Sequence, residues 1–117
     1  MKKRSLVVLA LSLLVSLAIC GAAVASELSD AAARGAGLFK DPALGTNGKS
    51  CATCHADGSV WAGQARFPKV ALGGLRTLDQ AIQICISSAL GGKLLPWDDA
   101  RLTALAAFVD AASTPKK

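Results

Sequence analysis

Residues 51–55 hold two cysteines and a histidine at a spacing suited to binding a porphyrin. Cys51-Ala52-Thr53-Cys54-His55 matches Cys-x-x-Cys-His, the pattern for covalent attachment of haem c. The thiols of Cys51 and Cys54 can add to the two vinyl groups of one haem, and His55 can present its imidazole to the iron as the proximal ligand. His55 is the only histidine of the chain. The motif therefore predicts one covalently bound haem c.

The second axial position of this iron has few possible donors. Electron-transfer cytochromes c mostly use methionine there, but Met1 is the only methionine and lies in a leader that we expect to be removed. The remaining options are Cys85, a lysine such as Lys69 or Lys93, water, or an open position. Cys85 could instead be a buried helix residue, because free cysteine often packs as a small apolar side chain.

The same donors allow two other interpretations. Cys51, Cys54, His55 and Cys85 make four donors, the number in a structural zinc site, although adjacent residues such as Cys54 and His55 fit a tetrahedron poorly. Cys51 and Cys54 could also form a thioredoxin-like dithiol, but that motif needs a strand–helix–strand frame, which the sequence does not indicate. Haem attachment accounts best for this spacing.

The first 25 residues have the pattern of a secretory signal peptide. A basic segment at residues 2–4 precedes an apolar stretch at 6–19, and Ala-Val-Ala at 23–25 offers a cleavage site. The apolar stretch is shorter than the roughly 20 residues of a spanning helix. We therefore expect a signal peptide over 1–25 and a periplasmic mature protein. The alternatives are an uncleaved membrane anchor and lipid attachment at Cys20, in a segment that partly resembles a lipoprotein box.

Residues 26–117 suffice for one small domain, which would carry the haem. The net charge of the whole chain is +5 at pH 7, and three of its 13 basic residues lie in the expected leader. The smaller mature charge argues against nucleic-acid binding. No second apolar stretch follows the leader, so we expect no stable membrane insertion after cleavage. Lys49, Lys69 and Lys93 could ring an exposed haem edge and steer an acidic redox partner.

Helical patterns organise this domain and predict an all-α fold with three main helices. The first helix should cover about residues 28–39 and end at Asp41-Pro42. The third should run from about 97 to 112, with a buried stripe of Leu102, Leu105, Ala106 and Val109. Between them, residues 59–74 include two adjacent glycines and predict an irregular wrap with little regular structure. Its aromatic residues, among them Trp61, would cover a haem edge, and we expect Trp97 to be packed as well.

The second helix has the clearest sequence signals. Thr77 and Gln80 form a capping box at its start, and Gly91 follows its last periodic residue, Leu90. Five residues at steps of three and four define one apolar face of this helix: Leu78, Ala81, Ile82, Cys85 and Ala89.

The order helix, Cys-x-x-Cys-His, glycine-rich wrap, helix, loop and closing helix resembles a class I cytochrome c over nearly all of the mature chain. Within that class it is similar to a haem domain of thiosulfate dehydrogenases and to Sox-type haem subunits. The similar segments are Phe67-Pro68, Thr77-Leu78, Ile82, Cys85, Gly92-Lys93, Leu95-Pro96 and Leu105-Ala106-Ala107-Phe108. The resemblance implies a first helix that crosses the last one, with Gly35 and Phe108 as candidates for the contact.

The resemblance also implies that Cys85 is the distal iron ligand, as a thiolate. Two positions depart from the family pattern. Leu90 replaces its methionine, and Ala81 replaces an arginine that would hold a sulfur oxyanion, which argues against thiosulfate chemistry.

We therefore expect a periplasmic monohaem cytochrome that carries single electrons between redox-partner proteins, not a catalyst. Its potential should be low, because a thiolate stabilises iron(III). The alternative is a haem enzyme or sensor subunit whose iron binds a sulfur compound such as thiosulfate, or a diatomic gas.

Overall fold

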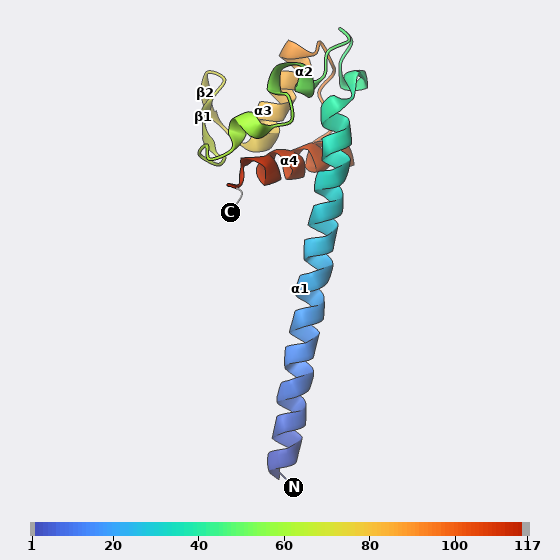
Figure 1. Ribbon diagram of the computed structural model, residues 1–117, viewed down its shortest axis with the longest axis vertical. Coiled ribbons are helices and arrows are strands. Elements are labelled where there is room, and N and C mark those ends of the chain that lie inside the picture. The colour runs from blue at the N-terminus through green and yellow to red at the C-terminus, as the bar shows by residue number, and fades with distance from the viewer. Residues whose placement is uncertain (1, 116–117) are drawn as a thin grey trace.

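Two crossing helices form the base of the fold. The computed structural model describes residues 2–115, and side chains for residues 7, 8 and 21–115. The long helix α1 (Lys2–Lys40) extends away from the rest of the chain, and α4 (Ala100–Ser113) crosses its C-terminal part (Figure 1). The short helix α2 (Cys51–His55), α3 (Leu78–Ile84) and a two-stranded hairpin complete the domain. The expected all-α class is confirmed.

The crossing of α1 and α4 occurs where it was expected, at Gly35 and Phe108. A Cβ atom on Gly35 would lie 2.7 Å from the Cβ of Phe108 and would collide with the carbonyl oxygen of Ala104. Glycine is therefore required for the two helix backbones to approach this closely. Nearby, the rings of Phe39 and Phe108 pack with their centroids 4.9 Å apart.

The first helix is longer than expected. We predicted a helix over about residues 28–39, but α1 is continuous from Lys2 to Lys40. No proline interrupts this stretch, so nothing forces a break near residue 26. The predicted end is correct, because Asp41 follows α1 and its side chain caps the 3₁₀ turn η1 (Pro42–Leu44) by accepting from the Ala43 amide. Within the part of the chain that the structure describes, no helix is long and apolar enough to cross a membrane.

The second predicted helix forms with its capping box and then changes type. Gln80 N donates to Thr77 Oγ1, and Thr77 N donates to Gln80 Oε1, so α3 begins as the sequence indicated. At Cys85 the helix becomes a π-helical turn, η3 (Cys85–Ala89), closed by a bond from Leu90 N to the Cys85 carbonyl. Such single π-turns are rare and occur often at functional sites.

The expected irregular wrap contains regular structure. Residues Ser59–Trp61 form the 3₁₀ turn η2, and β1 (Lys69–Ala71) pairs antiparallel with β2 (Gly74–Arg76). The two turn residues, Leu72 and Gly73, both have positive φ angles, 51° and 83°, as a type I′ hairpin turn requires. The prediction missed this hairpin because leucine, unlike glycine or asparagine, gives no signal for that conformation.

The core lies between α1, α4 and the segment from α3 to η3. Its central buried residues are Phe39, Leu44, Ile86, Leu90 and Leu105. The expected stripe of α4 is confirmed at Leu102, Leu105 and Val109, which are buried, whereas Ala106 is only half-buried. The expectation for Trp97 is wrong, because its side chain is 65% exposed.

Candidate haem site

A mainly apolar cavity of about 480 Å³ opens beside α2. Cys51, Cys54 and His55 contribute to its wall from α2, and Cys85 contributes from the end of α3. All five residues of the predicted apolar face of the second helix line the cavity: Leu78, Ala81, Ile82, Cys85 and Ala89. Leu105 and Val109 of α4 complete one wall. The tertiary fold thus brings the four candidate donors of the sequence to one apolar space.

The motif helix α2 is held by contacts at both of its ends. At its start, Ser50 N donates to Thr53 Oγ1 over 3.0 Å. At its end, Gly58 N donates to the His55 carbonyl over 2.9 Å, and Gly58 has a φ of 82°, which favours glycine. The His55 ring packs against Trp61, with ring centroids 4.8 Å apart. Trp61 therefore packs beside the imidazole and also lines the cavity, whereas its expected cover of a haem edge stays a prediction.

The Cys85 thiol shares the cavity with both cysteines of the motif. Burial, followed by the neighbouring Cys54, raises the pKa of the Cys85 thiol above its ordinary value. Burial also raises the pKa of Cys51, with Cys85 as the second cause. The protein alone therefore favours neutral thiols here. A nearby cation such as iron(III) would be needed to stabilise a thiolate.

The lysines considered as ligands or as a ring around the haem edge divide into two groups. Lys49 and Lys69 line the cavity, whereas Lys93 does not. The ammonium group of Lys69 donates to Gln64 Oε1 over 3.2 Å and lies 4.9 Å from the centre of the Phe67 ring. The expected ring of three lysines is thus only partly assembled at the cavity.

The structure gives no support to the two other interpretations of the cysteines. Although Cys51, Cys54, His55 and Cys85 line one cavity, no three His, Cys, Asp or Glu side chains among the described residues are arranged to hold a metal ion together. A thioredoxin-like dithiol lacks its frame, because the two strands in the described part form one antiparallel hairpin after the motif.

Several residues of the site were missed by sequence reasoning. Phe39 lines the cavity from α1, and Gln64 lines it from the loop before β1. Phe67 also lines the cavity, but it is one of the wrap aromatics that were expected there. The buried Gln83 binds the backbone of Leu95 twice: its Nε2 donates to the Leu95 carbonyl, and Leu95 N donates to its Oε1. Gln83 lies between the apolar positions of α3, so only its burial could have drawn attention to it.

An all-α domain with a Cys-x-x-Cys-His helix at the wall of an apolar cavity defines a class I cytochrome c. A comparison with protein-family models matches residues 34–117 to the SoxA/TsdA cytochrome c domain, and the chain belongs to that family. Searches of curated proteins and of solved structures gave no significant match. The cofactor is therefore haem c, covalently bound, and the protein has a haem-based role in electron transfer.

The cavity fits this cofactor. Its walls are mainly apolar, and its donors are two thiols at the thioether spacing and one imidazole. Cys85, the candidate distal ligand, lines the same cavity from a different element, and so does Lys69, another candidate donor.

Proposed function

We propose that this protein is a periplasmic monohaem electron carrier in which Cys51 and Cys54 tether the haem and His55 is the proximal ligand. Cys85 is the distal ligand. The observation that carries the proposal is that Cys85, at the start of the π-helical turn, lines the same apolar cavity as His55. The haem supplies a one-electron redox centre when bound.

The absence of a distal methionine supports a low reduction potential. Leu90 holds the position of the family's methionine and is buried in the core. A thiolate donates electron density and favours iron(III), whereas methionine raises the potential. Axial ligands together span roughly 0.8 V in haem proteins. We therefore expect a potential well below that of a cytochrome with histidine and methionine ligands.

Electron exchange with partner proteins follows from this role. Lys49 and Lys69 at the cavity wall would favour an acidic redox partner, because complementary charge speeds encounter. Ala81 in place of the family's arginine leaves the α3 side of the cavity without a cation that could hold a sulfur oxyanion. Electron transfer is therefore better supported than turnover of a sulfur compound.

Electron paramagnetic resonance of the oxidised holoprotein tests the distal ligand. The wild type should show a low-spin signal of the thiolate type, and Cys85→Ala should abolish it, because alanine offers no donor. Ser87→Ala is the matched control, since Ser87 is an exposed residue of the same turn and its loss should leave the signal unchanged.

Identical spectra for the wild type and Cys85→Ala would contradict the assignment of Cys85. A potential in the ordinary range of histidine–methionine cytochromes would contradict the low-potential part of the proposal. Rapid carbon monoxide binding by the reduced wild type would favour the open-site alternative, a gas or sulfur-compound site at the iron.

A further inference from the structure

The β-hairpin presents one of its two faces to the haem cavity. Lys69 and Ala71 of β1 line the cavity, whereas Val70 and Leu75 point away from it and are 81% and 68% exposed. In the register of the hairpin, Lys69 is directly opposite Arg76. Residues directly opposite in an antiparallel pair have side chains on the same face. The side chain of Arg76 is therefore on the cavity-side face of the hairpin, beside Lys69.

Arg76 lies on this face with an unsatisfied donor. Its Nε is buried and has no hydrogen-bond partner. Among the described residues, no other buried side-chain nitrogen or oxygen lacks one. The same guanidinium makes one weak bond, from Nη1 to the Leu75 carbonyl over 3.3 Å. Neither of the two ion pairs among the described residues involves Arg76. A buried, unpaired guanidinium donor is costly, so it requires an acceptor.

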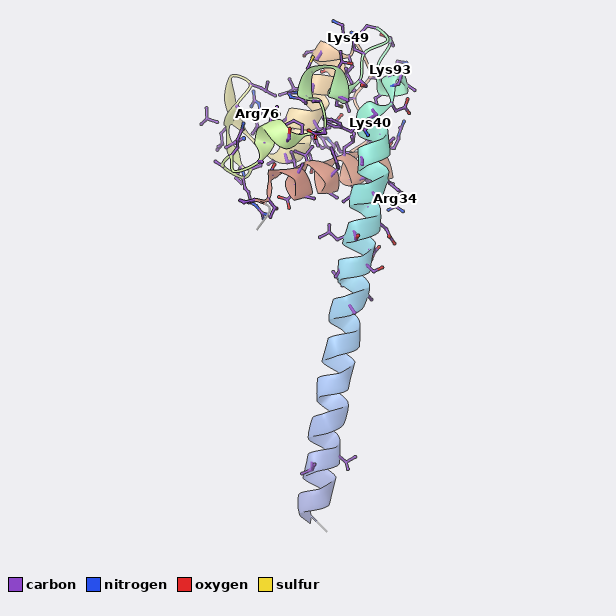
Figure 2. The ribbon with its side chains drawn as sticks, viewed as in Figure 1. Arg34, Lys40, Lys49, Arg76 and Lys93 are labelled. Carbon is purple, nitrogen blue, oxygen red and sulfur yellow. The ribbon has the colours of Figure 1, made fainter. Side chains whose placement is uncertain are left out.

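The guanidinium of Arg76 packs against the backbone of Gly74. A Cβ atom on Gly74 would lie 3.3–3.4 Å from Nη1, Cζ and Nη2 of Arg76, so the guanidinium packs over a position without a side chain. Figure 2 shows Arg76 on the hairpin side of the domain, apart from Arg34, Lys40 and Lys93, which lie toward α1. Arg76 is thus a separate cationic site and not part of a general basic surface.

We propose that Arg76, with Lys69 beside it, binds a propionate carboxylate of the haem and keeps it ionised. A propionate is a flexible two-carbon arm that ends in a carboxylate, so it can extend past the cavity wall to the neighbouring Arg76. Guanidinium groups match carboxylates through two parallel hydrogen bonds, which would employ the Nε that now lacks a partner. This inference rests on the covalent haem of the proposed function.

Lys69 supports Arg76 without replacing it. Its ammonium group has three donors, one of which is used by Gln64 Oε1. The other ionisable side chains that line the cavity are Lys49, Cys51, Cys54, His55 and Cys85. In the holoprotein the two tethering thiols are consumed and the two iron ligands are committed. Lys49 and Lys69 are then the remaining cations that line the cavity, and Arg76 lies opposite Lys69 on the hairpin.

The test monitors the ionisation of the haem propionate in three holoproteins: the wild type, Arg76→Gln and the control Arg34→Gln. Arg34 is an exposed cation on α1, so the control removes the same charge at a distance from the cavity. Midpoint potentials are measured from about pH 5 to pH 8, across the range where a buried, unpaired carboxyl group titrates. Infrared difference spectra over the same range report the neutral carboxyl group directly, which a titrating thiol does not mimic.

The wild type and Arg34→Gln should show a potential that is nearly independent of pH and no neutral carboxyl band. Arg76→Gln should show a lower potential at pH 7, a slope with pH, and the band as pH falls. If Arg76→Gln yields no holoprotein, Arg76→Lys replaces it and should show a smaller change of the same sign.

Suppose that Arg76→Gln carries the haem, as its mass shows, and that its potential-against-pH profile and infrared spectrum are identical to those of the wild type. This result would overturn the role of Arg76 but would leave the proposed electron carrier intact. A wild-type protein whose mass includes no haem would overturn the proposed function as well. Mass and haem absorbance therefore distinguish the two failures.

Discussion

At the scale of single residues, Gln83 connects the helix that carries Cys85 to the loop before α4. Its side chain is only 4% exposed, and both ends of its amide bind the backbone of Leu95. Leu95 in turn packs against the hydrophobic core. A buried amide that satisfies one donor and one acceptor of the backbone is difficult to replace, because its loss leaves both backbone groups unpaired.

We predict that Gln83→Met destabilises the holoprotein by about 2 to 4 kcal/mol, since two buried backbone groups lose their partners while the volume is retained. Urea unfolding followed by circular dichroism measures the change. Arg34→Met, at an exposed position of α1, serves as the control and should cost under about 1 kcal/mol. Equal losses in the two variants would show that the Gln83 bonds contribute nothing specific.

At the scale of elements, the start of α4 depends on one carboxylate. Asp99 accepts hydrogen bonds from the backbone N of Arg101 at 2.8 Å and from its Nε and Nη2 at 3.0 Å and 2.7 Å. The bonds from the Arg101 side chain are the largest cause that lowers the pKa of Asp99 to about 2. This carboxylate caps a helix that supplies Leu105 and Val109 to the cavity wall.

A depressed pKa makes the contribution of Asp99 dependent on pH. The stabilisation is present above the ordinary aspartate pKa and is lost as pH falls through about 2. We predict that NMR titration of the Asp99 carboxyl group gives a midpoint near 2, and that Arg101→Gln raises it toward 3.8. Arg66→Gln, which removes an arginine elsewhere, should leave it unchanged. An unshifted midpoint in Arg101→Gln would refute the proposed cause.

At the scale of the whole molecule, α1 has two parts with different roles. The described side chains before residue 31 are exposed, whereas Ala31, Gly35 and Phe39 are buried and pack in the domain. In Figure 1 the N-terminal part of α1 extends well beyond the other elements. Cleavage after residue 25, as the leader pattern predicts, would therefore remove none of the described buried residues.

We predict that the holoprotein purified from the periplasm has the mass of residues 26–117 plus one haem. Its thermal unfolding midpoint should match that of a chain in which Ala23→Lys and Ala25→Lys block cleavage, since the leader supplies none of the described core contacts. Mass spectrometry and calorimetry measure both quantities. A mass that includes residues 1–25, or an added lipid at Cys20, would contradict the predicted leader.

The amino-acid sequence by itself determined the local features of this protein. The Cys-x-x-Cys-His spacing, the capping box of Thr77 and Gln80, and the cavity-facing residues of the second helix depend on neighbours within one or two turns. The crossing at Gly35 was implied by the resemblance to class I cytochromes c, which rested on the order of these features. The family match over residues 34–117 supports that resemblance. The signal peptide and the iron ligands remain predictions.

Only the tertiary structure decided what depends on contacts between distant segments. It placed Cys85 at the same cavity as Cys51 and Cys54, replaced the expected regular helix end with a π-helical turn, and paired Gln83 with Leu95. It also set the hairpin register that puts Arg76 opposite Lys69. The physical reason is that burial and cross-strand pairing are properties of the folded chain, so hydrogen-bond partners far apart in sequence leave no periodic signal in it.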